Sequence, residues 1–366
     1  MKVSQLGFGA MRLPMIGEGD TARVDREKTI PMIHHAFEAG VNYIDSAVFY
    51  CNGDSQRAVG DALKGWRNKI IVSTKNNYYG QDEADWWRNL EDSLKRLQVE
   101  YIDVYNQHGM NWANYEKHYA PHISKWMAKA KHQGLIGHIC CSFHDDNNGL
   151  KKLIETDEFS AFTVQYNLLD RRLEEGIALA HERNIGVVVM GPVAGGRLAE
   201  PSEMLQNIIP GVKRMPELAL RFVLSNPNVT MTLSGMSAME HVVENLATAS
   251  DEISLSEADR AAIEEQMVRM KEMAELYCTG CGYCMPCPSE VGISGIFEKY
   301  NRGRIYGLWK SARHAYRKMG TVSWDSAKTA DACTGCGECE EKCPQKIPIR
   351  KQLAEAHEAL AGCCDK

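Results

Sequence analysis

The sequence predicts a (β/α)8 barrel followed by a small, mainly α-helical domain that is rich in cysteine. Eight short β-rich segments alternate with amphipathic helical patterns over about 250 residues, which is the size and rhythm of such a barrel. Eight of the 13 cysteines then fall in two short runs near the C-terminus, behind a charged helical stretch. We therefore expect residues 1–265 to form the barrel and residues 266–366 to form the cysteine-rich domain.

The expected strands are short runs of β-branched and aromatic residues. In chain order they are Gln5–Phe8, Tyr43–Asp45, Ile70–Thr74, Tyr101–Asn106, Ile136–Cys140, Phe162–Gln165, Val187–Met190 and Thr230–Ser234. A doubly wound parallel sheet shows the same alternation, but its first turn carries a Gly-x-Gly-x-x-Gly fingerprint. Here the first turn reads Gly7-Phe8-Gly9-Ala10-Met11-Arg12 and lacks the third glycine. The barrel is therefore favoured.

The helices between these strands are expected from apolar residues that recur every three or four positions. The first covers residues 25–39, with Ile30, Ile33 and Phe37 on one face and Gly40 as its stop. Pro31 leaves the start of this helix open, because proline is best tolerated in a first turn. The other expected helices are Ser55–Lys64, Ala84–Leu97, His118–Gln133, Gly149–Glu155, Leu173–Arg183, Pro216–Ser225 and Met239–Ala249.

Each cysteine run ends in Cys-Pro. The first reads Cys278-x2-Cys281-x2-Cys284-x2-Cys287-Pro288, and the second reads Cys333-x2-Cys336-x2-Cys339-x3-Cys343-Pro344. This spacing is typical of a ferredoxin module with two [4Fe–4S] clusters, in which the fourth cysteine of each run binds the other cluster. The expected ligands are Cys278, Cys281, Cys284 and Cys343 for one cluster, and Cys333, Cys336, Cys339 and Cys287 for the other. The first run departs from the bacterial pattern, because two residues rather than three precede its last cysteine.

Two other uses of these cysteines are less favoured. Structural zinc usually takes two Cys-x2-Cys pairs separated by a spacer, rather than four crowded cysteines. A disulfide framework needs an oxidising compartment, and no signal-peptide pattern follows Met1. Helical patterns around Ser294–Tyr300 and Leu308–Met319 occupy the connection between the runs. The domain is therefore expected to resemble the α-helical type of ferredoxin.

Composition excludes several classes of function. A net charge of −6 argues against nucleic-acid binding. No apolar run approaches the ~20 residues that span a bilayer. Because no targeting segment is recognisable, we expect a cytoplasmic location.

Polar residues follow the expected strands at the end where a (β/α)8 barrel carries its chemistry. Asp45 and Tyr50 follow the second strand, Lys75 the third and His108 the fourth. Singly, each of these residues is more often structural than catalytic. Together they resemble the aldo-keto reductase superfamily, in the stretches Asn42-Tyr43-Ile44-Asp45-Ser46-Ala47 with Tyr50, Ser73-Thr74-Lys75 and Gln107-His108. The resemblance runs from about residue 3 to residue 250, and it is closer still to bacterial and archaeal members with a fused [4Fe–4S] tail.

The resemblance implies a catalytic tetrad of Asp45, Tyr50, Lys75 and His108 that reduces a carbonyl or related small molecule. Tyr50 would supply the proton, and the Lys75 ammonium would ease its release. Asp45 would keep Lys75 charged. His108 would donate a hydrogen bond to the carbonyl oxygen as negative charge develops there.

The resemblance also implies an extended nicotinamide dinucleotide across the barrel mouth. Ser142 and Gln165 stand where the family binds the carboxamide, and Met190 stands where many members stack an aromatic ring. Phe143 replaces the polar residue that commonly follows Ser142. The pyrophosphate and adenosine ends would meet Gly191, Gly195, Gly196, Arg197, Gly235, Ser237, His241, Glu244 and Asn245. Because His241 replaces the cation that grips a 2′-phosphate, NADH is favoured over NADPH.

The two parts differ in how many electrons they carry. A nicotinamide delivers two electrons as one hydride, whereas iron–sulfur clusters carry single electrons. A flavin would separate the pair, but no motif here indicates one. Three hypotheses follow: an NAD(P)-linked oxidoreductase whose clusters exchange electrons with a partner, a ferredoxin-driven reductase without nicotinamide, and a non-catalytic redox sensor. The complete tetrad argues against the sensor.

A basic stretch between the cysteine runs predicts a docking surface for ferredoxin or another low-potential electron carrier, because acidic partners are steered to basic surfaces. A solvated helix face explains the same charges equally well. The stretch contains Lys299, Arg302, Arg304, Lys310, Arg313, Arg317 and Lys318.

Overall fold

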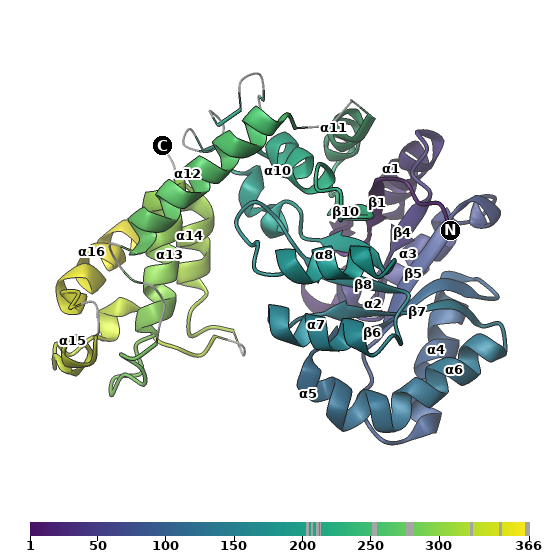
Figure 1. Cartoon of the computed structure of the whole chain (residues 1–366), viewed down its shortest axis with the longest axis horizontal. Coiled ribbons are helices and arrows are strands. Elements are labelled where there is room, and N and C mark those ends of the chain that lie inside the picture. The colour runs from purple at the N-terminus through teal and green to yellow at the C-terminus, as the bar shows by residue number, and fades with distance from the viewer. Residues whose placement is uncertain are drawn as a thin grey trace. The chain divides into compact units, whose positions relative to one another are not determined.

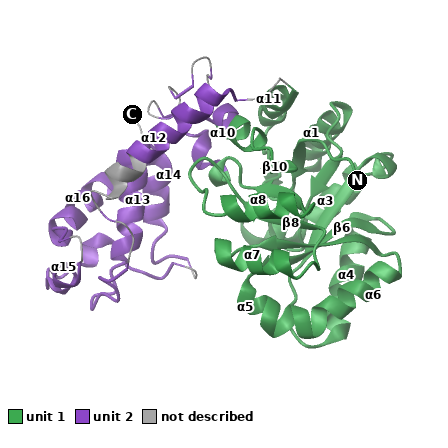
Figure 2. Cartoon of the chain, viewed as in Figure 1, with its two compact units in different colours: residues 1–195, 219–254 green, residues 196–218, 255–366 purple. Residues whose placement is uncertain are grey.

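The computed structural model divides the chain into two compact units, shown in different colours in Figure 2. Unit 1 comprises residues 1–195 and 219–254, and unit 2 comprises residues 196–218 and 255–366. The structure describes the chain except residues 203–204, 206–207, 210–211, 213, 251–254, 276–277, 279–281, 323–324, 344–345 and 363–366, and it describes no side chains for 270–275.

Unit 1 is a closed barrel of eight parallel strands with helices around it (Figure 1). The strands are β1 (Leu6–Gly9), β4 (Tyr43–Asp45), β5 (Ile71–Asn76), β6 (Ile102–Met110), β7 (Ile136–Phe143), β8 (Ala161–Gln165), β9 (Gly186–Met190) and β10 (Met231–Gly235). Each strand pairs with its sequence neighbour in the barrel, and β10 closes the ring onto β1. The predicted (β/α)8 fold is confirmed. Two strands run further than expected, since β6 includes His108 and β7 reaches Phe143.

The barrel interior is apolar at one end and polar at the other. Tyr43, Val104, Cys140, Val188, Met231 and Leu233 form a buried apolar cluster. Side chains two residues apart on a strand face the same way. Two positions further along, the same faces therefore present Asp45, Asn106, Ser142 and Met190 at the carboxyl ends of the strands. The apolar layer supports the polar one, which is where barrel enzymes place their chemistry.

Helices cover the outside of the barrel. They are α1 (Arg26–Glu38), α3 (Ser55–Ala62), α4 (Glu83–Leu97), α5 (Trp112–Asn114), α6 (Ser124–His132), α7 (Asn147–Glu155), α8 (Glu174–Glu182) and α11 (Met239–Ser250), while α10 (Met215–Leu224) crosses the division between the units. The short segment α2 (Tyr50–Gly53) lies between β4 and α3 and has left-handed backbone at Cys51 and Asn52. The expected helix at 118–133 is longer than predicted, because a π-helix (Tyr115–Ile123) containing Pro121 joins α5 to α6. Proline lacks an amide proton, and a widened turn accommodates it.

The first helix begins earlier than its proline would suggest. Asp25 caps α1 by accepting a hydrogen bond from the Lys28 amide, and Pro31 lies inside the helix. Its buried face includes Ile33 and Phe37, as the pattern predicts. Before it lies a two-stranded hairpin of β2 (Met15–Ile16) and β3 (Arg23–Val24), which is too short to give a periodic signal in the sequence.

Unit 2 is mainly helical, as predicted. Its helices are α12 (Glu257–Glu275), α13 (Ile293–Tyr306), α14 (Trp309–Arg317), α15 (Glu338–Lys342) and α16 (Ile349–Ala361). Ile296, Phe297, Tyr316 and Leu353 lie in its buried core.

The segment 196–218 belongs to unit 2 through specific hydrogen bonds. Ser202 Oγ donates to the Tyr306 carbonyl at 2.6 Å. The Glu200 carboxylate accepts from the amides of Lys310 and Ser311 at the start of α14, at 2.6 and 3.0 Å. Unit 2 therefore consists of this segment and of the chain from Leu255 onward. The expected domain boundary at 265/266 falls inside α12. The domain boundary stays a prediction. Among the described residues, no helix is long and apolar enough to cross a membrane.

Substitution of two glycines of α13 by alanine is expected to have opposite effects on the stability of unit 2. A Cβ on Gly303 would lie 2.3 Å from the Trp309 ring, whereas a Cβ on Gly295 would meet only the Lys299 ammonium at 3.7 Å. Gly303→Ala is expected to destabilise unit 2 by about 1–3 kcal/mol through overpacking. The control Gly295→Ala is expected to stabilise it by up to about 1 kcal/mol, because alanine favours helix. Thermal unfolding measures both changes, and equal midpoints for the two variants would contradict the packing described.

Candidate active site and cluster-binding site

Four predicted catalytic side chains meet at the carboxyl ends of neighbouring strands. Asp45 ends β4, Lys75 lies near the end of β5, His108 lies in β6 and Tyr50 begins α2. Lys75 Nζ donates to Asp45 Oδ2 at 2.5 Å and to the Ser46 carbonyl at 2.9 Å. The same nitrogen lies 4.8 Å from the centre of the Tyr50 ring. The structure therefore brings an ammonium between a carboxylate and a phenol.

Burial and charge act against each other in this group. Burial by itself would lower the pKa of Lys75, but the Asp45 carboxylate and Tyr50 outweigh it, and the pKa is raised. Lys75 is 2% exposed and stays charged. Burial raises the pKa of Tyr50, and the charge of Lys75 opposes that rise. The phenol thus holds its proton at neutral pH, beside a cation that favours its release.

A chain of buried hydrogen bonds leads to Asp45 from across the barrel. Ser73 Oγ donates to Asp45 Oδ1 at 2.8 Å. Asn106 Nδ2 donates to Ser73 Oγ at 3.2 Å, and Thr163 Oγ1 donates to Asn106 Oδ1 at 3.4 Å. Every donor in this chain points toward the carboxylate, so the chain supports its negative charge.

His108 is a neutral imidazole in this site. Burial first, and then the charge of Lys75, lower the pKa of His108 to about 3. Its ring stacks on Phe49 with centroids 4.9 Å apart and an interplanar angle of 4°, and it meets the Tyr50 ring edge-on at 6.1 Å. A neutral imidazole can donate one hydrogen bond to a carbonyl oxygen, which fits the predicted role.

The expected carboxamide contacts lie at the ends of the next strands. Ser142 Oγ accepts from the Gly109 amide at 3.2 Å and lies 3.5 Å from His144 Nε2. Gln165 and Met190 end β8 and β9. Gly191 has a φ of +66°, and the Gln165 amide would lie 3.4 Å from a Cβ at that position. Glycine is therefore required where the chain turns over Gln165.

The residues expected at the other end of the dinucleotide are spread over both units. Gly195 belongs to unit 1, while Gly196 and Arg197 belong to unit 2 and are described only within it. After β10, Ser237 Oγ lies 3.4 Å from His241 Nδ1. On α11, Asn245 Nδ2 donates to Ser234 Oγ at 3.0 Å, and the Glu244 carbonyl accepts from Thr248 Oγ1 at 2.9 Å. Asn245 therefore has a structural role at the end of β10, next to Gly235.

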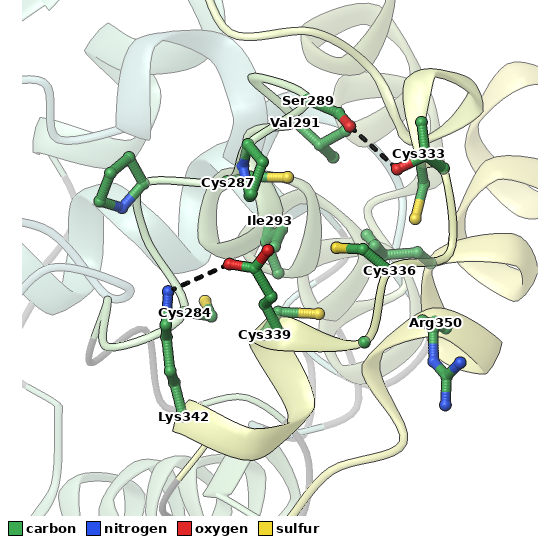
Figure 3. A pocket seen from close by; sticks show the side chains of 16 residues that line it. Cys284, Cys287, Ser289, Val291, Ile293, Cys333, Cys336, Cys339, Lys342 and Arg350 are labelled. Carbon is green, nitrogen blue, oxygen red and sulfur yellow. Dashed lines mark hydrogen bonds and ion pairs between the residues drawn. The ribbon is translucent and has the colours of Figure 1, made fainter.

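Cysteines of both runs line one hollow in unit 2 (Figure 3). The hollow is lined by the thiols of Cys284, Cys287, Cys333, Cys336 and Cys339, by the apolar side chains of Val291, Ile293 and Leu353, and by the polar or charged side chains of Ser289, Thr334, Glu338, Lys342 and Arg350. Figure 3 shows Cys287 and Cys336 pointing toward one another from separate segments. Several thiols gathered around one hollow suit a [4Fe–4S] cluster, so the residues present fit the group. Cys284 and Cys287 of the first run both lie beside three cysteines of the second run, so cross-ligation through Cys287 stays a prediction.

The remaining cysteines are only partly described. Cys278 is half-buried, and its carbonyl accepts from Asn301 Nδ2 at 3.2 Å. Cys343 is buried in the core of unit 2. Cys281 lies outside the described residues. Within the described part of the chain, no three His, Cys, Asp or Glu side chains converge to hold a single metal ion.

Comparison with known proteins agrees with this geometry. A family model described as "Aldo/keto reductase family" matches residues 5–214. The chain belongs to the aldo/keto reductase family. A second model, described as a "4Fe-4S dicluster domain", matches residues 277–347. The protein is therefore an aldo/keto reductase family oxidoreductase with a 4Fe–4S domain.

Several relatives cover most of the barrel. The uncharacterized oxidoreductase YqkF of Bacillus subtilis is 28% identical, over 68% of this chain and 88% of that protein. The NADH-specific methylglyoxal reductase of Escherichia coli is 27% identical, over 75% of this chain and 95% of that protein. Among solved structures, the holo form of aldo-keto reductase AKR11C1 from Bacillus halodurans has a TM-score of 0.63 and 29% identity, over 72% of this chain and 92% of that one.

Three residues of this aldo/keto reductase site were missed by reasoning from sequence. His144 lies one residue beyond β7, and its ring is 6.5 Å from that of His108. Strand alternation would have found it, since Ser142 faces inward, Phe143 is buried on the outer side and His144 returns inward. Phe49, which stacks on His108, directly precedes Tyr50. Arg12 is exposed, with its guanidinium 3.4 Å from a Cβ built on Gly195 and its stem beside Gly235.

The depressed pKa of His108 predicts part of the pH dependence of stability. The unfolded imidazole takes up a proton below its usual pKa of ~6.5, whereas the folded one does so only near 3. Unfolding therefore takes up a proton between these values, and stability falls as pH falls from about 6.5 toward 3. His108→Gln is expected to lose less stability than the wild type between pH 7 and pH 5. Urea denaturation at both values measures it, and an equal or larger loss in the variant contradicts a neutral His108.

Cross-ligation predicts which pairs of cysteines act on the same cluster. Two [4Fe–4S] clusters hold about eight irons per chain, and Cys287→Ala is expected to leave about four. Adding Cys333→Ala removes a second ligand of the same cluster and should leave the iron content unchanged. Adding Cys278→Ala instead should remove most of the remaining iron. Iron analysis of the anaerobically purified variants distinguishes these cases. Loss of the remaining iron with Cys333→Ala, but not with Cys278→Ala, would assign Cys287 to the cluster of the first run.

Proposed function

We propose that this oxidoreductase reduces the carbonyl group of a small molecule with NAD(P)H, using Asp45, Tyr50, Lys75 and His108. The observation that carries the proposal is the buried Lys75 ammonium, held by Asp45 at 2.5 Å and placed 4.8 Å from the Tyr50 ring. A plain structural ion pair has no need of a phenol and a neutral imidazole beside it.

The reaction needs a proton on oxygen and a hydride on carbon. Bound NAD(P)H supplies the hydride. The Tyr50 hydroxyl gives its proton to the carbonyl oxygen, and the Lys75 ammonium stabilises the phenolate that remains. His108 donates a hydrogen bond to the same oxygen, and Asp45 holds Lys75 in place through both steps.

Nicotinamide binding is supported by Ser142, Gln165 and Met190 at the ends of β7, β8 and β9. Arg12 has no ion pair with any described residue, and its position beside Gly195 and Gly235 suits a diphosphate. His241 would meet a 2′-phosphate only weakly, so NADH is the proposed nucleotide. The Escherichia coli relative, described as an NADH-specific methylglyoxal reductase, makes an α-oxoaldehyde the first substrate to test.

The clusters of unit 2 are proposed to exchange single electrons with a low-potential carrier such as ferredoxin. The basic stretch predicted to dock such a partner is only partly available in this unit. Arg302 pairs with Glu298, Lys299 lies 3.6 Å from Asp325, and Arg313 donates to the Ala359 carbonyl at 3.0 Å. Lys310, Arg317 and Lys318 are exposed on and just after α14, and these three are the proposed contacts.

A ferredoxin-driven reductase without nicotinamide is the second candidate. The cysteine-lined hollow favours it, because a hydride donor alone does not require clusters. Anaerobic mixing with NADH, NADPH or reduced ferredoxin separates the two candidates through the absorbance of the clusters. Bleaching by NADH links nicotinamide to the clusters and calls for an electron splitter such as flavin. Bleaching by ferredoxin alone, with no NADH-dependent reduction of methylglyoxal, favours the second candidate.

Removing the proposed proton donor should abolish reduction while leaving the fold intact. Tyr50→Phe is expected to lower kcat for the NADH-dependent reduction of methylglyoxal by about 100-fold or more. Tyr101→Phe, at a 45% exposed tyrosine outside the site, should change kcat by less than about twofold. Absorbance at the nicotinamide band measures both rates. A Tyr50→Phe protein that keeps wild-type activity would remove the tetrad from the mechanism.

A further inference from the structure

The chain directly after Tyr50 adopts an unusual backbone. Cys51 and Asn52 have φ values of +52° and +54°, and Gly53 follows at +79°. Three consecutive left-handed residues are uncommon, and for Cys51 the conformation costs free energy because its Cβ crowds the following carbonyl. Such a segment persists only where surrounding contacts hold it, and strained backbone tends to lie at functional sites.

Those contacts are present. Within the segment, the Arg57 side chain donates to the Gly53 carbonyl and the Asp54 amide donates to the Cys51 carbonyl, while two side chains reach the loop that follows β1. Asn52 Nδ2 donates to the carbonyls of Gly19 and Ala22 at 3.0 and 3.1 Å. Asp54 Oδ2 accepts from the Val24 amide at 2.9 Å. Asn52 and Asp54, which we call the clamp, therefore bind the connection between β2 and β3 and the second of these strands.

Arg26 strengthens the clamp with a forked ion pair. Its Nη1 lies 2.6 Å from Asp54 Oδ2, and its Nη2 lies 2.9 Å from Asp54 Oδ1. Nη1 also donates to the Val24 carbonyl at 3.1 Å. This two-point geometry fixes direction as well as distance. The side chains of Arg26 and Asp54 are 29% and 18% exposed, so the pair is partly shielded from water.

Tyr50 itself has few backbone restraints on its other side. Its amide donates one long hydrogen bond, of 3.3 Å, to the Ala47 carbonyl. The ring of Tyr50 contacts Phe49, His108 and Lys75, and on the backbone side the conformation of the next three residues is expected to influence where the phenol lies. Relaxation of the left-handed segment is expected to shift the Tyr50 ring from its position 4.8 Å from the ammonium.

We propose that Asn52 and Asp54 are positioning residues for Tyr50: they tie the strained segment to the β2–β3 hairpin and so hold the phenol in register with Lys75. The inference rests on the proposed function of Tyr50 as proton donor. It adds two residues outside the tetrad that set the rate of proton transfer without touching the substrate. Misplacement of a reacting group by about 1 Å can cost about 100-fold in rate, which makes the clamp kinetically important.

The structure offers a closely matched control for the test. Arg26 also pairs with Asp61, through Nε at 3.1 Å, at a carboxylate that is away from both Tyr50 and the hairpin turn. Asp54→Asn is expected to lower kcat for the NADH-dependent reduction of methylglyoxal by about tenfold or more, with a smaller change in the KM for NADH. Asp61→Asn, which removes an ion pair of the same arginine, should change kcat by less than about twofold.

A second pair of variants tests the hydrogen bonds of the Asn52 side chain without changing the tolerance for positive φ. Asn52→Gly keeps a residue that tolerates positive φ but removes the two clamp hydrogen bonds. Asn184→Gly makes the same change at an exposed residue with a φ of +58° in the turn before β9. Only the first is expected to lower kcat. Equal effects of the two would assign Asn52 to general stability and overturn the proposal.

A double-mutant cycle separates positioning from stability. If the clamp acts through Tyr50, Asp54→Asn should cost nothing further in a Tyr50→Phe background, whereas a merely structural effect would be additive. Additive losses overturn the proposal.

Hydrogen exchange gives a readout that needs no substrate. Asp54→Asn should speed amide exchange at residues 15–24 and 47–53, and Asp61→Asn should not. If the wild type fails to reduce methylglyoxal with NADH, the proposed nicotinamide-linked function fails on that substrate, while unchanged exchange in Asp54→Asn overturns the clamp.

Discussion

The ammonium of Lys75 is almost fully enclosed, at 2% exposure, and the polar layer of the barrel is arranged to keep it charged. A buried cation is costly unless it is paired and hydrogen-bonded. Here Asp45 and the Ser46 carbonyl meet that requirement, and the chain from Thr163 through Asn106 and Ser73 supports the carboxylate in turn. Removing one partner of such a pair is strongly destabilising, so the charge, the position of Asp45 and the register of β4 against β5 depend on one another.

The closed barrel explains why this arrangement forms at the carboxyl ends of the strands. Inward-facing residues are apolar around Val104 and Cys140 and become polar two positions later. One end of the barrel interior is therefore an apolar core, and the other end carries the polar side chains of the site. The low polarity of the surroundings strengthens every interaction in the site. Burial lowers the pKa of both Lys75 and His108, but Asp45 and Tyr50 raise the pKa of Lys75 again. The site therefore contains a charged ammonium next to a neutral imidazole that can donate a hydrogen bond.

Much of this could be predicted from sequence: the barrel follows from the spacing of the strands, and the tetrad is what the resemblance to the aldo-keto reductase superfamily implies. The strand ends placed Asp45, Lys75 and His108 at the reactive end of the barrel, and the resemblance singled them out among the polar residues there. His144 was missed because the resemblance directed attention to Phe143, although the alternation along β7 places Phe143 outside. The left-handed backbone at Cys51 and Asn52 could not be predicted, since neither residue is glycine and their conformation depends on contacts with the distant hairpin. The basic stretch was predicted as a surface, yet Lys299 is buried and Arg302 is paired, because charge in a sequence carries no information about burial.

The most direct test of the central role of Lys75 is the pKa of Tyr50, measured by pH titration of the 13Cζ resonance of labelled tyrosine, with Tyr50→Phe to assign the signal. The charge of Lys75 opposes the rise that burial causes in this pKa. Lys75→Met should therefore raise the pKa of Tyr50 above its wild-type value. An unchanged or lower pKa in Lys75→Met would show that the ammonium does not act on the phenol, and would contradict the account of the site.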